Sequence, residues 1–266
     1  MNQPRAPIPS ATILMVRDAP DLEVLMVVRH HQIDFASGAL VFPGGKLAPD
    51  DAAPEWRMLA DGAEGLSEME ISLRVGAIRE AFEESGLILA RPGAQRGAGA
   101  PLAGCAAAQA IAVHRDAVAR GELAFSRVIA DAGLALALDT LVDYAHWITP
   151  AIMPKRFDTY FFLAPAPQDQ LAGHDGRETV DAAWVRPGAV LQEMRAGARK
   201  IIFPTRLNIE RLGESVSVAQ ALTAARARAH VVVEPVVVME EGRAILVIPA
   251  EAGYSVTREP LEGNQP

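Results

Sequence analysis

The chain has 266 residues, half of them hydrophobic, which is enough for one large domain, or one domain with an appendage, around a substantial core. A formal net charge of −8 and a pI near 5.3 argue against a nucleic-acid-binding surface, because such surfaces need a basic patch. The one cysteine, Cys105, excludes an internal disulfide, and the chain shows neither a secretory signal nor an apolar run long enough to cross a bilayer, so we expect a cytoplasmic protein.

Two apolar runs rich in β-branched residues open the chain. Residues 11–16 and 22–28 predict two strands of a mixed sheet, joined by a turn at 17–21. Arg29 follows the second run, and its planar guanidinium is suited to bind a phosphate through two hydrogen bonds; an ordinary solvated strand end is the alternative. Residues 46–65 mix Asp, Pro, Gly and Ala and predict a loop with one helical turn.

The next segment carries helix signals at both of its ends. Ser67 and Glu70 have the spacing of a capping box, in which each side chain binds a free amide of the first turn. Gly86 predicts the helix end, because the residue after a helix often takes a left-handed conformation that suits glycine. The spacing between these signals places one apolar face on the helix, made of Ile71, Val75, Ile78 and Phe82.

Three carboxylates, those of Glu80, Glu83 and Glu84, fall roughly opposite that face in the last two turns. The position is unfavourable, since like charges four residues apart repel by about 0.2–0.5 kcal/mol and the C-terminal end of a helix is already negative. Arg79 can pair with Glu83, but one guanidinium does not neutralise three carboxylates. The cluster therefore predicts a seat for a hard divalent cation such as Mg²⁺, with a solvated acidic face as the alternative.

The remainder of the chain predicts further helices and strands between surface segments. Gly, Ala and Pro at 91–101 indicate a surface loop. Residues 258–266 are predicted to form a disordered tail. Strands are predicted at 147–150, 157–163 and 180–185, with a turn at 174–177 and a closing hairpin of 231–239 and 243–248, in which Pro235 favours an edge. Helices are predicted at 106–120, 122–131, 134–141, 188–195, 205–212 with Thr205 as N-cap, and 216–227.

Two short segments together resemble the signature of the Nudix hydrolases. Val41 to Gly45 reads Val-Phe-Pro-Gly-Gly, and Arg79 to Leu87 matches the second half of the signature: Arg-Glu, an apolar residue, any residue, Glu-Glu, any residue, Gly and an apolar residue. Relative to the family pattern, about twenty residues are inserted between Gly45 and Arg79, which resembles the coenzyme A diphosphatase-like branch. The insertion leaves open which acid supports Arg79; the candidates are Asp50, Asp51, Glu68 and Glu70.

The resemblance implies the fold and its division along the chain. It implies an α/β (α+β) sandwich, the Nudix fold, in which a mixed β-sheet lies between helices. The Nudix domain is expected at residues 8–212, with helical insertions at about 47–66 and 96–140. Residues 213–257 are expected to form a C-terminal helix and β-hairpin extension packed on the same domain.

The same resemblance implies the residues of the site. Arg79, Glu80, Glu83 and Glu84 are the expected catalytic residues, and the three glutamates are expected to hold Mg²⁺ or Mn²⁺. A backbone carbonyl of Gly44 or Gly45 is a further expected metal ligand. Glu178, just after the predicted turn, is also expected to bind the metal, with a solvated acid at a strand edge as the alternative. Substrate contacts are expected from Arg29, Phe42 and Arg156, where for Arg156 an ion pair at a strand start is the alternative.

The function implied is hydrolysis of a diphosphate linked to another moiety, with coenzyme A or acyl-coenzyme A as the preferred substrate. ADP-ribose, NADH and nucleoside triphosphates stay open as substrates. So does a Nudix-fold module that binds a nucleotide without hydrolysing it, although the intact glutamates count against such a module. A di-iron carboxylate bundle is excluded, because it needs Glu-x-x-His pairs and the sequence has none. We expect no nucleic-acid or membrane partner and leave a homodimer open.

Overall fold

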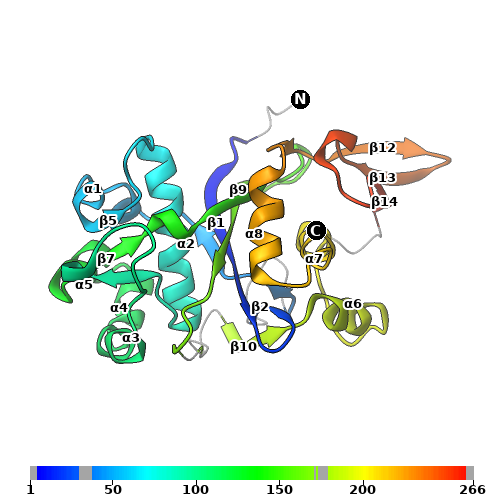
Figure 1. Cartoon of the computed structure of the whole chain (residues 1–266). Coiled ribbons are helices and arrows are strands. Elements are labelled where there is room, and N and C mark those ends of the chain that lie inside the picture. The colour runs from blue at the N-terminus through cyan, green and yellow to red at the C-terminus, as the bar shows by residue number, and fades with distance from the viewer. Residues whose placement is uncertain (1–4, 30–37, 171, 173–178, 262–266) are drawn as a thin grey trace.

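The computed structural model describes residues 5–29, 38–170, 172 and 179–261. Its centre is a mixed sheet in the order β10-β2-β1-β9-β8-β11, with β3 paired to β2 and β4 to β1 (Figure 1). β1 runs parallel to β9 and antiparallel to β2. The strands of this sheet are β1 (Ile8–Asp18), β2 (Leu22–Arg29), β3 (Leu40–Val41), β4 (Gly44–Lys46), β8 (Val142–Ile148), β9 (Phe157–Pro165), β10 (Thr179–Val185) and β11 (Val232–Val233).

Strand β1 feeds two separate cores because its side chains alternate between the two faces of the sheet. Ile13 and Met15 are buried in a core shared with α2 (Glu68–Ser85). Leu14 and Val16 are buried in a second core shared with the helices after residue 186. Figure 1 shows α2 on one side of the sheet and α8 on the other, so the predicted sandwich is confirmed.

Helix α2 begins and ends where its sequence predicts. Ser67 is the N-cap, its side-chain oxygen accepts from the Glu70 amide, and Glu70 binds the Ser67 amide in return. Gly86 ends the helix in the left-handed region at φ 76°. The predicted apolar face is buried, but so are Glu80 and Glu84, which shows that the helix is covered on more than one side.

Beside α2 lies a smaller layer that corrects two predictions. Residues 134–141, predicted as a helix, form strand β7 and a short 3-10 turn, because β7 pairs with β5 and β6 in a sheet of its own. Arg91, predicted to lie in a surface loop, is buried within that sheet. The elements are α1 (Trp56–Leu59), β5 (Ala60–Asp61), β6 (Ala90–Pro92), α3 (Cys105–Ala112), α4 (Arg115–Ala119), α5 (Phe125–Asp131) and β7 (Leu134–Ala137), with 3-10 turns at Pro49–Ala52, Gly93–Gln95 and Leu138–Thr140.

The C-terminal third covers the other face of the sheet, with three further corrections. Thr205 is not an N-cap, since α7 begins at Phe203 with Ile202 as the capping residue. Residues 258–260 are ordered as β14 on β13, and the predicted strand 231–239 is split, with β11 on β8 and β12 in a separate sheet. The elements are α6 (Pro187–Arg195), α7 (Phe203–Leu212), α8 (Val218–Ala227), β12 (Val236–Glu240), β13 (Arg243–Val247) and β14 (Arg258–Pro260), with a 3-10 turn at Ala250–Ala252.

The segment after Leu212 packs into the second core together with β1. Ala221 and Ala225 of α8, and Leu246 and Tyr254 beyond it, are buried in the same cluster as Leu14. The predicted turn at 174–177 lies outside the described residues. Among the helices that the structure describes, none combines the length and apolar character needed to cross a membrane.

Candidate active site

The acid that supports Arg79 is Asp51, which comes from the insertion before α2. Its two carboxylate oxygens accept from Arg79 Nε at 2.8 Å and Nη2 at 2.9 Å, and Asp51 itself is fully buried. The Ala48 amide also donates to Asp51 at 2.7 Å, which fixes the carboxylate on its 3-10 turn. This bidentate geometry is the strongest form of an arginine–carboxylate contact.

The other acids considered for this role have different partners. Asp50 accepts from the amide and hydroxyl of Ser126, and Glu68 pairs with Arg57. Glu70 is used by the capping box at Ser67. The choice among the four therefore depends on which side chain the insertion turns toward α2, and spacing along the chain does not encode that direction.

The remaining side of the Arg79 guanidinium binds two of the three predicted glutamates. Nη1 donates to Glu80 at 2.8 Å and to Glu83 at 2.9 Å, and Nη2 also donates to the Lys46 carbonyl at 2.9 Å. Burial alone would lower the pKa of Arg79, but the surrounding carboxylates, with Glu80 first among them, raise it above its ordinary value. Arg79 is therefore a fixed cation that orients the acidic end of the helix.

Glu80 is a buried carboxyl with a shifted pKa. Burial raises its pKa to about 7; Arg79 opposes this shift, and the negative charge of Glu83 adds to it. Gly45 lies directly against it, because a Cβ built on Gly45 would come within 2.6 Å of both Glu80 carboxylate oxygens. Only a glycine lets the strand pass this close to the carboxylate.

Glu84 faces the same strand from the last turn of α2. Its Oε2 accepts from the Gly44 amide at 3.1 Å, and Glu84 is buried. Gly44 is itself pressed against β1, since its Cβ would come within 2.4 Å of the Thr12 hydroxyl oxygen. The two glycines and the three glutamates that the sequence singled out are therefore brought together, on β4 and α2.

An arginine that the sequence did not single out holds the end of this helix. Arg115 of α4 donates through Nη2 to the Glu83 carbonyl at 2.8 Å. A cation at this position is favourable, because the last carbonyls of a helix carry its negative dipole end. Arg115 belongs to the helical insertion 96–140, and no local sequence signal connects it to α2.

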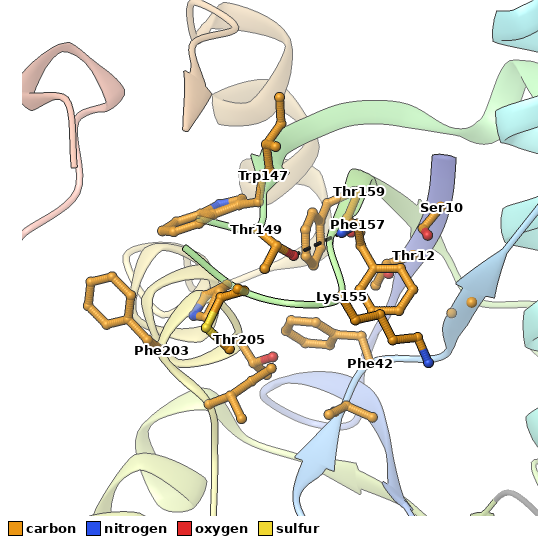
Figure 2. Close-up of a pocket in the computed structure, with 18 of the residues that line it drawn as sticks. Ser10, Thr12, Phe42, Trp147, Thr149, Lys155, Phe157, Thr159, Phe203 and Thr205 are labelled. Atoms are coloured by element: carbon orange, nitrogen blue, oxygen red, sulfur yellow. Dashed lines mark hydrogen bonds between the residues drawn. The ribbon is translucent and has the colours of Figure 1, made fainter. Parts of the chain in front are cut away.

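A cavity of about 660 Å³ opens beside the acidic end of α2. Its walls come from β1, β4, the end of α2, the β8–β9 turn, the start of α7 and the C-terminal sheet. Figure 2 shows Phe42, for which a substrate contact is expected, within this cavity between Thr12 and Thr205. Three exposed lysines that the sequence did not single out also line it: Lys46, Lys155 and Lys200.

Of the other residues predicted to contact substrate or metal, Arg156 lies outside the cavity. Arg156 is buried and donates to the carbonyls of Thr149 and Arg5 and to Glu234, so the ion pair is the alternative that the structure shows. It does not line the cavity, because its guanidinium ties the β8–β9 turn to the C-terminal segment. Arg29 ends β2, but its side chain lies outside the described residues, as does Glu178.

Known proteins resemble this chain in sequence and in fold. A family model described as the NUDT19 Nudix domain matches residues 64–212. The chain is 24% identical over 219 residues to the acyl-coenzyme A diphosphatase NUDT19 of Xenopus laevis, covering 69% of this chain and 57% of that protein. It is 25% identical over 237 residues to the human protein of that name, covering 76% of this chain and 63% of that one.

A solved structure shows the same fold over most of the chain. The crystal structure of a NUDIX hydrolase from Alicyclobacillus acidocaldarius superimposes with a TM-score of 0.69 and 27% sequence identity, covering 82% of this chain and 96% of that one. The chain spans 57% and 63% of the length of the two curated relatives. The matched domain, the shared fold and the signature on α2 lead to one conclusion: the chain belongs to the Nudix hydrolase family.

Proposed function

We propose that this chain hydrolyses the diphosphate of coenzyme A or acyl-coenzyme A, giving 3′,5′-ADP and phosphopantetheine or its acyl derivative. The observation that carries the proposal is the cluster of Glu80, Glu83 and Glu84, of which Glu80 and Glu84 are buried; the cluster faces two close-packed glycines at the head of a cavity of about 660 Å³. A cavity of this volume is in the range that encloses a whole small-molecule ligand. The curated names of the matched relatives support the substrate class.

The residues at this end of α2 suit a divalent cation by their chemistry. They supply carboxylate and carbonyl oxygens, the donors that Mg²⁺ and Mn²⁺ prefer. Burial raises the pKa of Glu80, and the negative charge of Glu83 adds to the shift, so a cation at this position would stabilise the ionised carboxylate. Within the described part of the chain, no three acidic, His or Cys side chains converge as a ligand set, since Arg79 lies between Glu80 and Glu83.

Metal binding would therefore require a local exchange of partners at α2. Glu80 and Glu83 would turn from Arg79 toward the cation, while Asp51 keeps the guanidinium in place through two hydrogen bonds. Glu84 and a carbonyl of Gly44 or Gly45 would complete the oxygen donors. A bound divalent cation supplies charge neutralisation at the diphosphate oxygens and a water of lowered pKa.

The rest of the cavity supplies binding and orientation. Lys46, Lys155 and Lys200 place positive charge along its rim, where phosphate groups of the substrate would bind. One molecule of water breaks the phosphorus–oxygen–phosphorus link. The water oxygen becomes bonded to one phosphorus, the other phosphate keeps the bridging oxygen, and the two protons of the water are released or taken up by the products. The fixed charges around the site stabilise the transition state because they need no reorganisation during the reaction.

The proposal is tested by incubating the purified chain with a panel of diphosphates and resolving the products by mass. We expect 3′,5′-ADP from coenzyme A with Mg²⁺ or Mn²⁺, and none in EDTA. Faster hydrolysis of ADP-ribose or NADH would replace the substrate assignment. Binding of a nucleotide without turnover under any divalent metal ion would favour the non-catalytic module instead.

A further inference from the structure

One end of the cavity is apolar and is built largely by residues that follow Leu212. Pro235, Val237, Leu246 and Leu261 line it, and none of them belongs to the segment matched by the family model. Val237 of β12 and Leu246 of β13 are direct partners in the strand register, so their side chains lie on the same face of the hairpin. The C-terminal sheet thus adds an aliphatic wall to the cavity.

A second wall of this end is aromatic, and a hydrogen bond fixes its tryptophan. Trp147 of β8 and Phe203 of α7 meet edge to face, with ring centroids 5.9 Å apart, and both are buried. Figure 2 shows them on the side of the cavity away from Ser10 and Thr12, which are paired with Lys46 and Gly44 of the acidic end. The cavity therefore runs from charged to apolar.

Tyr254 removes the one polar atom of Trp147 from the cavity wall. Trp147 Nε1 donates to the Tyr254 hydroxyl at 2.9 Å, and that hydroxyl donates to Asn208 Oδ1 at 2.8 Å. Arg211 lies over the Tyr254 ring, with its guanidinium carbon 3.5 Å from the ring centroid, which limits the positions that the ring can take. Trp147 is therefore held in one orientation and presents carbon atoms to the cavity.

We propose that this end of the cavity is a subsite for the aliphatic chain of an acylated substrate, with Tyr254 as the positioning residue of its aromatic wall. The inference rests on the proposed function, because the aliphatic acyl chain must be attached to the substrate molecule whose diphosphate lies at Glu80. A nucleobase fits this end poorly, since its edge needs hydrogen-bond partners. The polar side-chain atom of the aromatic wall, Trp147 Nε1, is already bound to Tyr254.

The test compares coenzyme A with decanoyl-coenzyme A as ligands, measured by calorimetry in EDTA so that no turnover occurs. The wild-type chain should bind decanoyl-coenzyme A at least tenfold more tightly, because buried methylene groups favour binding. Val237→Asn should reduce this preference to about twofold. Val236→Asn is the matched control, since Val236 is its neighbour on β12, is 55% exposed and does not line the cavity; the preference should be retained.

Tyr254→Phe tests the positioning role without removing the ring. Loss of the hydroxyl leaves Trp147 Nε1–H without its acceptor, so the preference for the acylated ligand should fall about threefold or more. A thermal melt of each variant shows whether the fold is retained. The affinity for coenzyme A serves as the internal reference, because only the ratio of the two affinities reports on the apolar end.

Three results separate the inference from the proposed function. Equal affinities of the wild-type chain for the two ligands would overturn the subsite, even if both ligands are hydrolysed with Mg²⁺. An equal loss of both affinities in Val237→Asn would also overturn it, since another part of the substrate would then occupy this end. Tighter binding of decanoyl-coenzyme A than of coenzyme A, without hydrolysis of either ligand, would support the subsite and refute the proposed function.

Discussion

Two buried arginines of this chain, Arg79 and Arg91, have different surroundings. Arg79 binds three carboxylates, those of Asp51, Glu80 and Glu83. In the small sheet beside α2, Arg91 and Arg96 share two carboxylates, with Arg91 bound to Asp61 and to both oxygens of Asp139. The first cluster has an excess of negative charge and the second is balanced.

One carboxyl in each cluster has a shifted pKa, and the two shifts have opposite directions. Burial raises the pKa of Glu80 to about 7. Burial also acts on Asp61, but hydrogen bonds from Gly97, Arg96 and Arg91 outweigh it and lower the pKa of Asp61. A balanced buried cluster holds elements together, whereas an unbalanced one beside a cavity is suited to bind a further cation. The following changes test that contrast.

The largest effect on stability is expected at the balanced cluster. Arg91→Ala should lower the free energy of unfolding by about 3–5 kcal/mol, because it removes a buried guanidinium that binds the buried Asp61 and both oxygens of Asp139. The kcat of the folded fraction should stay within about twofold of wild type. Urea denaturation measures the stability, and Arg127→Ala is the control, since its exposed pair with Asp131 contributes about 0.5 kcal/mol or less.

The unbalanced cluster should respond in activity instead. Glu84→Gln keeps the size of the side chain and its contact with the Gly44 amide, so the melting temperature should shift by only a few degrees. The kcat should fall about a hundredfold or more, the scale seen when a key electrostatic group of an active site is removed. Turnover at the wild-type rate would take Glu84 out of the site.

A pH-dependent effect is expected at Glu80, whose pKa is raised from 4.5 to about 7 in the folded chain. Its contribution to stability is therefore complete below about pH 4.5 and is lost as the pH rises through about 7. Glu80→Gln cannot ionise, so the unfolding free energy of this variant relative to wild type should increase between pH 5 and pH 8. The expected increase is on the order of 2–3 kcal/mol, measured in EDTA.

Glu70→Gln is the control for this pH dependence. Hydrogen bonds from Ser67 hold the pKa of Glu70 below its ordinary value. Because its pKa lies below 4.5, Glu70 is largely ionised above pH 5, and the stability of the variant relative to wild type should change little between pH 5 and pH 8. A flat profile for Glu80→Gln as well would show that the pKa of Glu80 is not raised in the folded chain.

The sequence by itself determined the acidic helix and its approximate surroundings. The capping box at Ser67, the stop at Gly86 and the grouping of three glutamates are local patterns, so spacing along the chain was sufficient to predict them. The same holds for β1 and β2, whose apolar runs and intervening turn are short-range signals. The family signature is carried by these same local segments.

Only the tertiary structure decided which distant residues meet this helix. Asp51 was one of four candidate acids until the fold brought its carboxylate against Arg79, and residues 134–137 became a strand because β5 and β6 offered partners. Arg156 binds Glu234 rather than the cavity, and Tyr254 reaches Trp147 across more than a hundred residues. Such contacts depend on packing between elements far apart in the chain, and no periodicity within one element encodes them.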